Sequence, residues 1–216
     1  GVGVDKIDLT AASEKGIWVT NTPGANADAV ADLTFGLMLS IARYIPQTFQ
    51  LLKEGEWVRY RGRQLWEKTL GIVGLGAIGK KVAFRAKGFS MRILGYDIYK
   101  DENFARENNI EFVDLDTLFK ESDFITFHIP LIPQTDNLVN KRTLSLMKPT
   151  AYLVNLARGG IVNSKDLYQC LKDKKIAGAA LDVLVDEPPK KDEPLLSLDN
   201  IVITSHIGAN TVEGIR

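Results

Sequence analysis

The sequence predicts an α/β protein built on a doubly wound parallel β-sheet. From residue 69 onward, short and continuous apolar segments alternate with segments of helical spacing. Apolar segments without polar alternation are typical of strands that helices cover on both faces. Strands that alternate with helices in this way predict βαβ units and therefore parallel pairing. A glycine-rich turn at residues 74–79 joins the first of these strands to a helix, which is where folds of this class bind ligands.

The first 22 residues predict a small unit of their own. Residues 1–4 are strand-like, Asp8 is placed to cap a short helix, and Gly16 is placed to end it. A second short strand is expected at residues 17–20, followed by a turn at residues 21–24.

A long helix is expected next, over residues 26–44. Its apolar residues, among them Val30 and Leu37, keep helical spacing, so one face should be buried. Pro46 is expected to end this helix, and a second helical piece should span residues 47–53.

The remainder of the chain supplies the sheet and its covering helices. Strands are expected at residues 70–73, 92–96, 111–113, 124–127, 151–154, 177–181 and 201–204. Helices are expected between them at residues 77–88, 101–108, 114–120, 140–146 and 164–173.

The glycine turn carries the strongest functional signal. Gly74 allows a tight turn, Gly76 lets the backbone approach a pyrophosphate, and Gly79 lets the helix pack closely on the strand. The helix that follows offers free N–H groups to the phosphates. Asp97, 18 residues after Gly79 and at the end of the second strand, can accept hydrogen bonds from ribose hydroxyls. The pattern therefore predicts a dinucleotide site, whereas a turn with packing glycines alone leaves Asp97 without a role.

Composition narrows the class of partner. Twenty-seven Lys and Arg residues balance 27 Asp and Glu residues, which argues against nucleic acid or an anionic membrane as a partner. No apolar segment reaches the length of a membrane helix, because Arg43 interrupts the nearest candidate. The single Cys170 fits a reducing, cytoplasmic location and predicts a buried structural thiol. Two His and one Cys give no metal-ligand spacing, so no metal is expected.

Polar residues follow several of the predicted strands directly. His128, Arg158, Asp182 and His206 each come just after a strand, and Glu187 lies a few residues beyond one. The carboxyl ends of parallel strands meet at one edge of a sheet, so these side chains should gather where a dinucleotide ends.

Three of these residues are candidates for substrate binding and proton transfer. Arg158 offers a rigid fork that matches a carboxylate. His206 can exchange a proton near neutral pH, and Glu187 could hold its imidazole and favour the protonated form. The residues leave alternatives open. Arg158 could form a surface salt bridge, Glu187 could be a solvent-exposed acid, and His206 could be a histidine without a catalytic role. His128 is expected to form part of the cofactor wall, because Pro130 stiffens its loop.

These residues resemble the motifs of the NAD-dependent D-isomer-specific 2-hydroxy acid dehydrogenases, a family that includes 3-phosphoglycerate dehydrogenases and glyoxylate/hydroxypyruvate reductases. The resemblance covers nearly the whole chain. The motifs that carry it lie at residues 1–8, 21–24, 74–79, 128–131, 155–160, 181–183, 187–189 and 206–209.

The resemblance implies a Rossmann fold and hydride transfer between NAD(H) and C2 of a small D-2-hydroxy or 2-keto acid. Arg158, Glu187 and His206 match the catalytic trio of the family, and Asp182 matches a residue near the nicotinamide amide. Asp97 favours NAD over NADP, although Lys100 could accept a 2′-phosphate. The cofactor contacts implied are Val2, Gly74, Gly76, Ala77, Ile78, Gly79, Asp97, His128, Ile129, Pro130, Leu156, Ala157, Arg158, Asp182, His206, Gly208 and Ala209.

The resemblance also implies that the chain is a piece of a longer protein. Residues 1–22 would be a remnant of a flavodoxin-like substrate-binding domain, residues 23–206 the NAD-binding domain, and residues 207–216 the return to the first domain. The family also implies a homodimer formed through the NAD-binding domain. A different class of function, an NAD(H)-sensing co-repressor of the same fold, is the alternative.

Overall fold

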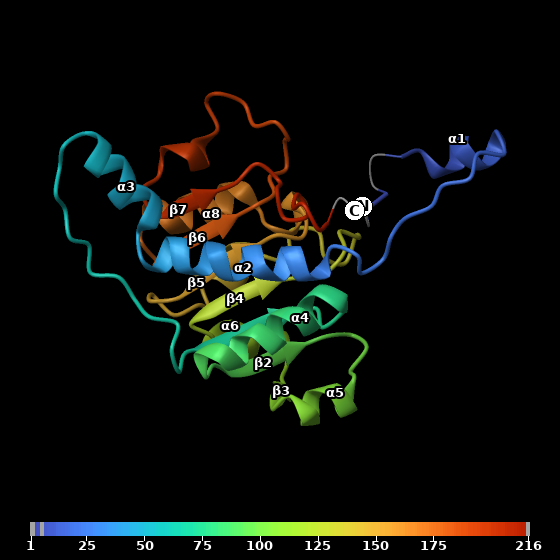
Figure 1. Cartoon of the computed structure of the whole chain (residues 1–216), viewed down its shortest axis with the longest axis horizontal. Coiled ribbons are helices and arrows are strands. Elements are labelled where there is room, and N and C mark those ends of the chain that lie inside the picture. The colour runs from blue at the N-terminus through green and yellow to red at the C-terminus, as the bar shows by residue number, and fades with distance from the viewer. Residues whose placement is uncertain (1–2, 5–6, 215–216) are drawn as a thin grey trace.

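The computed structural model describes residues 3–4 and 7–214, and its centre is a seven-stranded parallel sheet. The strand order is β3-β2-β1-β4-β5-β6-β7, with helices on both faces (Figure 1). The strands are β1 (Thr69–Val73), β2 (Arg92–Tyr96), β3 (Ile110–Phe112), β4 (Phe124–Phe127), β5 (Tyr152–Asn155), β6 (Gly178–Leu181) and β7 (Ile201–Ile203). The predicted doubly wound parallel sheet is confirmed.

Four of the five α-helices between the strands begin at polar caps, and α4 is the exception. Asp101, Asp114, Asn140 and Asn163 each accept a hydrogen bond from a backbone N–H of the first helical turn. The helices are α4 (Ala77–Ala86), α5 (Glu102–Glu107), α6 (Leu115–Glu121), α7 (Lys141–Leu144) and α8 (Ser164–Lys172), with short 3₁₀ segments η1 (Lys87–Phe89), η2 (Gly159–Ile161) and η3 (Pro194–Ser197). All five predicted helices are present, α7 being shorter than expected.

Each face of the sheet has its own hydrophobic core. Val154 of β5 packs with Met38 in the core beneath α2 (Ala27–Ala42) and α4. Leu153, one residue earlier, packs with Phe119 in the core beneath α6, α7 and α8. Because successive strand residues enter opposite cores, both must be apolar, which accounts for the continuous apolar segments of the sequence.

The helix α2 ends earlier than the sequence suggested. It stops at Ala42, and Tyr44 takes a left-handed conformation with φ of 55°. Pro46 then lies in the first turn of α3 (Ile45–Lys53), where a missing N–H breaks no helical bond. The expectation that Pro46 ends the long helix is therefore wrong, since this proline begins the next one. No single helix in the described part of the chain could span a membrane; α2 and α3 reach the length only as a pair bent by 60°.

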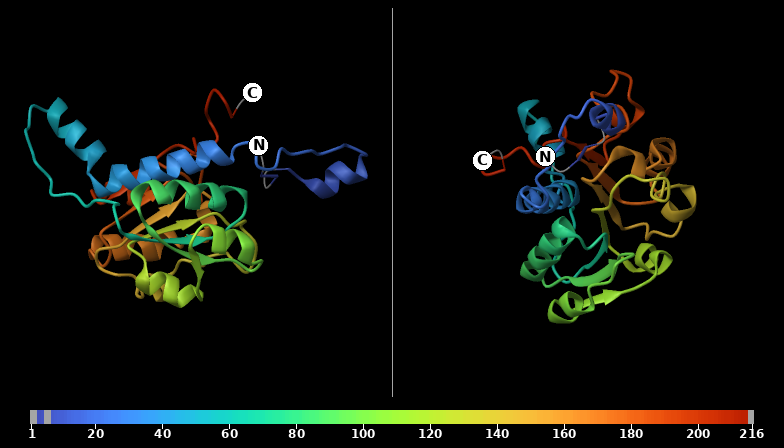
Figure 2. Two further views of the ribbon diagram at one scale, coloured as in Figure 1. Left: turned by 60° about the horizontal axis from the view of Figure 1, so that its bottom comes forward. Right: turned by 90° about the vertical axis from the view of Figure 1, so that its right-hand side faces the viewer.

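The N-terminal segment projects from the sheet (Figures 1 and 2). Asp8 caps α1 (Leu9–Glu14) by accepting from the N–H of Ala11 at 2.9 Å, as predicted. The strand expected at residues 17–20 is wrong, because these residues form none. A strand needs a neighbour for its backbone groups, and within the described residues nothing pairs with this segment. The strand expected at residues 1–4 lies partly outside the described residues, and Gly3 and Val4 are not in a strand.

Candidate active site

The site is built at the carboxyl edge of the sheet, around the point where the strand order reverses. The chain passes from β1 to β2 on one side, while β4 to β7 follow on the other. The loops after β1 and β4 therefore diverge and leave a crevice between them, which is where ligands bind in such sheets.

The glycine turn has the geometry of an anion cradle. Gly74 takes a φ of 95°, and a side chain there would lie 2.6 Å from the carbonyl oxygen of His128. A Cβ on Gly79 would overlap the carbonyl oxygen of Gly74, so the helix can approach the turn only because residue 79 is glycine. A Cβ on Gly76 would meet no protein atom within 4 Å, and no side chain caps α4 at this position. The open first turn of α4 is suited to a pyrophosphate.

Asp97 lies beside this turn. Its Oδ2 accepts a hydrogen bond from the N–H of Leu75 at 2.6 Å, and its Oδ1 accepts one from the N–H of Tyr99 at 2.9 Å. Each oxygen can accept a second bond, so the carboxylate can still bind ribose hydroxyls. Lys100 places its Nζ 5.5 Å from the ring centroid of Phe112.

His128 closes the other wall of the crevice. Its Nε2 lies 3.0 Å from Thr126 Oγ1, and its buried Nδ1 has no partner among the described residues. Burial lowers the pKa of His128 to about 3, so the imidazole is neutral near pH 7. Ile129 and Pro130 continue this wall, and the Ile129 side chain would lie 2.7 Å from a Cβ on Gly74. A neutral, packed imidazole suits the wall position that the sequence analysis assigned to His128.

The corner after β5 presents Arg158. This residue is half-buried, and its Nη1 donates to the carbonyl oxygen of Ala157 at 2.7 Å. Leu156 is buried in the core on the α2 side and supports the corner from below. The corner lies directly against the next loop, because a Cβ on Gly159 would overlap the backbone of Leu184.

Glu187 and His206 meet in space although 19 residues separate them. Glu187 Oε2 lies 2.8 Å from Nδ1 of His206, and Glu187 Oε1 accepts from the N–H of Leu184 at 3.2 Å. His206 takes a left-handed conformation with φ of 55°. Both side chains line a hollow of about 350 Å³ whose other walls include Pro188 and Ile203. The imidazole is thus held on one nitrogen by a carboxylate, as proton transfer from the other nitrogen requires.

Asp182 holds the loop that carries His206. Its buried carboxylate accepts from Thr204 Oγ1 at 2.5 Å and from the N–H groups of Ile207 and Gly208 at 2.9 and 2.8 Å. Its backbone oxygen also accepts from the N–H of His206 at 2.9 Å. The sequence did not predict this anchoring role, because it depends on contacts between residues that lie 22 to 26 positions apart.

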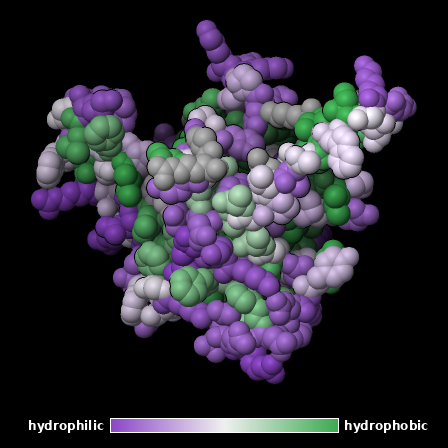
Figure 3. Space-filling model, turned by 45° about the vertical axis from the view of Figure 1, so that its right-hand side comes forward, coloured by the Kyte–Doolittle hydropathy of each residue, from purple (hydrophilic) through white to green (hydrophobic). Residues whose placement is uncertain are grey.

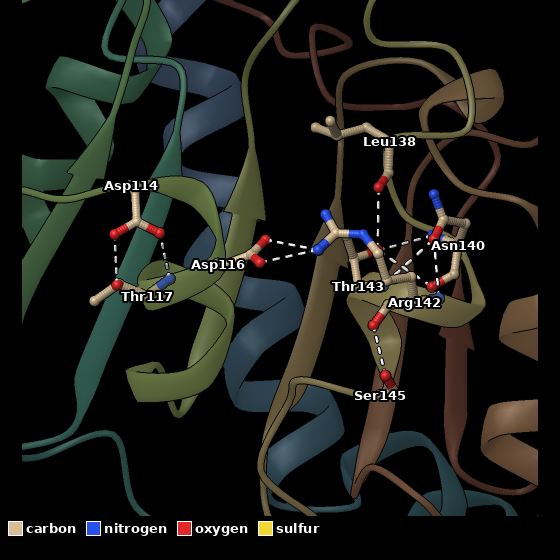
Figure 4. A network of polar contacts seen from close by, with 8 residues as sticks. All are labelled: Asp114, Asp116, Thr117, Leu138, Asn140, Arg142, Thr143 and Ser145. Atoms are coloured by element: carbon tan, nitrogen blue, oxygen red, sulfur yellow. Dashed lines mark hydrogen bonds and ion pairs between the residues drawn. The ribbon is translucent and has the colours of Figure 1, made fainter.

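A polar network supports the loop between β4 and α7 (Figure 4). Asn140 Oδ1 accepts from the N–H groups of Arg142 and Thr143, while Thr143 Oγ1 donates to the Leu138 carbonyl oxygen at 3.0 Å. Arg142 pairs with Asp116 of α6 at 2.9 Å. Backbone bonds then join this loop to residues 160–163, just beyond Arg158. The network therefore stabilises the corner from outside the site.

Val2, expected at the cofactor, lies outside the described residues. Cys170 is buried as expected, and burial raises the pKa of its thiol. Among the described residues, no group of three or more His, Cys, Asp and Glu side chains could hold a metal ion.

The fold and the anion cradle define a dinucleotide-binding α/β domain. Residues 35–208 match the model of the D-isomer specific 2-hydroxyacid dehydrogenase NAD-binding domain. The chain therefore belongs to this family, and the cofactor of the matched domain is NAD.

Named relatives agree with this assignment. The chain is 52% identical to D-3-phosphoglycerate dehydrogenase of Methanocaldococcus jannaschii, over 99% of the chain and 41% of that protein. It is 48% identical to hydroxypyruvate reductase of Thermotoga maritima, over 100% of the chain and 71% of that protein. A crystal structure of D-lactate dehydrogenase from Aquifex aeolicus with NAD and lactic acid superposes with a TM-score of 0.88 at 33% identity, over 100% of the chain and 70% of that structure. The chain thus spans less than half the length of the first of these relatives.

Proposed function

We propose that the protein is an NAD-dependent dehydrogenase of small D-2-hydroxy acids. The observation that carries the proposal is the Glu187–His206 contact of 2.8 Å, at the same sheet edge as the glycine turn. The names of the relatives support the same class of reaction.

The reaction divides between cofactor and protein. NAD(H), when bound, accepts or donates the hydride at C2 of the substrate. Arg158 binds the substrate carboxylate by directing its guanidinium N–H groups to the two oxygens. During reduction, Nε2 of His206 donates a proton to the carbonyl oxygen, and during oxidation it accepts the hydroxyl proton. Glu187 orients the ring through Nδ1 and stabilises the imidazolium form.

The remaining site residues hold the cofactor. Gly74, Gly76 and Gly79 shape the turn, and Asp97 accepts bonds from the ribose. Asp182 contributes at the nicotinamide end through the loop that it anchors. Further contacts are assigned to Val2, Ala77, Ile78, His128, Ile129, Pro130, Leu156, Ala157, Gly208 and Ala209.

The substrate is a small 2-hydroxy or 2-keto acid. Relatives named phosphoglycerate dehydrogenase and hydroxypyruvate reductase favour 3-phosphoglycerate, or glyoxylate and hydroxypyruvate. Arg158 and His206 bind only the part common to all of these acids, the carboxylate and the neighbouring carbonyl.

The test is NADH oxidation by the full-length protein with glyoxylate, hydroxypyruvate, 3-phosphohydroxypyruvate and pyruvate. Replacing the proton donor, His206→Ala, should lower kcat by about 10²- to 10⁴-fold while NADH still binds. Ser205 lines the same hollow, and the change Ser205→Ala should leave turnover within about twofold, because an alcohol does not exchange protons near neutral pH as an imidazole does and alanine keeps nearly the same volume. Binding of NADH without reduction of any of the four acids would refute the proposal.

Two features support a larger assembly. We assign residues 1–22 and 207–216 to a second, substrate-binding domain, which agrees with the exposure of Trp18, a residue of the projecting segment that is 92% exposed. The arm formed by residues 45–61 also stands away from the sheet, before the chain returns to the core at Leu65, and apolar surface lies at this left-hand edge (Figure 3). We propose that the arm forms a homodimer interface.

A further inference from the structure

The side chain of Asn155, the last residue of β5, is fully buried and uses both halves of its amide. Its Nδ2 donates to the carbonyl oxygen of Arg158 at 2.9 Å, and its Oδ1 accepts from the N–H of Ala157 at 3.0 Å. One amide thus closes the corner that ends at Arg158.

This pair of bonds requires asparagine. The corner presents one donor, the Ala157 N–H, and one acceptor, the Arg158 carbonyl oxygen. Aspartate would offer two acceptors and a buried charge, and serine is too short to reach both groups. The corner then fixes the guanidinium, because Arg158 Nη1 donates back to the Ala157 carbonyl oxygen at 2.7 Å.

The same corner is coupled to the loop that carries Glu187. The backbone oxygen of Asn155 accepts from the N–H of Asp182 at 2.9 Å. Gly159 packs so closely on Leu184 that no Cβ fits between them. A displaced corner would therefore move Arg158 relative to the Glu187–His206 pair.

We propose that Asn155 is a positioning residue that sets Arg158 in the orientation required to bind the substrate carboxylate. This inference rests on the proposed function, since it acts through the carboxylate contact of Arg158. It predicts a selective effect, in which carboxylate binding weakens while the cofactor, held at the glycine turn, binds as before.

The test compares Asn155→Ser with the wild type in the full-length protein. Serine can still accept from the Ala157 N–H but leaves the Arg158 carbonyl oxygen without its partner. The KM for the 2-keto acid substrate and the Ki of oxamate, a carboxylate that resembles it, should rise about tenfold. The dissociation constant of NADH should stay within about twofold. Asn163→Ser is the matched control, because serine replaces asparagine equally well at the N-cap of α8. Asn155→Asp, which keeps the size of the side chain, should reproduce the loss and guards against a folding defect in the serine variant.

A double variant separates positioning from general support. Adding Asn155→Ser to Arg158→Ala should weaken oxamate binding no further than Arg158→Ala alone, because the residue acts through Arg158. Additive losses, or an equal loss of NADH binding, would overturn the positioning role and leave the proposed function intact. If the wild type with NADH neither binds oxamate nor reduces any 2-keto acid, the proposed function fails and the positioning role fails with it.

Discussion

At the scale of single residues, environment separates the two histidines. Both follow strands at the carboxyl edge of the sheet. His128 is packed against the glycine turn with its pKa lowered to about 3 by burial, whereas the His206 side chain is 47% exposed and pairs with Glu187. Of the two, only His206 combines access to a substrate with a carboxylate partner, which is why we propose it for proton transfer.

The low pKa of His128 makes stability depend on pH. In the unfolded chain this imidazole binds a proton below about pH 6.5, but in the folded protein it does so only near pH 3. Its contribution is therefore complete above pH 6.5 and decreases as the pH falls toward 3. Between pH 7 and pH 5 the free energy of unfolding should fall by about 2 kcal/mol from this group.

The variant His128→Gln should remove this dependence, because glutamine can still bond to Thr126 but does not titrate. Urea unfolding at the two pH values measures the difference, and the carboxylates contribute equally to both proteins. A variant as sensitive to pH as the wild type would show that His128 is protonated in the folded state.

At the scale of elements, the glycines of the turn between β1 and α4 have different tasks. Gly79 is needed for the fold, whereas Gly76 is needed for the proposed ligand. Gly79 is required by the protein itself, since a Cβ there overlaps the Gly74 carbonyl oxygen. Gly76 faces open space, so nothing in the protein excludes a side chain there.

Two alanine variants should therefore behave differently. Gly76→Ala should change the free energy of unfolding by less than about 1 kcal/mol, yet weaken NADH binding by about tenfold or more, because the methyl group enters the pyrophosphate position. Gly79→Ala should destabilise the fold by about 1–3 kcal/mol through overpacking. Gly88→Ala, where a Cβ also meets no atom, is the control for both. Denaturant unfolding and NADH fluorescence titration provide the measurements, and equal NADH affinity in Gly76→Ala would place the pyrophosphate elsewhere.

Local patterns predicted elements whose determinants lie within a few residues. The glycine turn, the capped α1 and the continuous strands are of this kind. The prediction for Pro46 was wrong because proline is found both after the end of a helix and in the first turn of one. Which of the two occurs here depends on the left-handed backbone of Tyr44. The prediction of a strand at residues 17–20 was wrong, because a strand needs a neighbouring strand that its own sequence does not supply. The anchoring role of Asp182 could not be predicted because its partners, Thr204, Ile207 and Gly208, lie in the loop after β7, 22 to 26 residues along the chain.

At the scale of the whole molecule, helices cover both faces of the sheet, but two other segments of the chain remain largely exposed. The N-terminal segment and the arm both project from the body, and both expose large apolar side chains. On α3 these are Ile45, Phe49 and Leu52, which share one helical face and are each at least half exposed. Apolar surface concentrated on a projecting element marks an interaction site.

The dimer proposal predicts that one charge on this face separates the subunits. Phe49→Glu should convert the full-length protein from dimer to monomer, because removing a carboxylate from water in an apolar interface costs more than pairing with Lys53, whose Nζ lies 5.2 Å from the centroid of the Phe49 ring, would return. Phe84→Glu is the matched control, since Phe84 on α4 has similar exposure, 65% against 61%, but lies outside the arm. Light scattering after size exclusion gives both masses. A Phe49→Glu dimer would contradict the arm as an interface, and dissociation of Phe84→Glu alone would move the interface to the surface of α4.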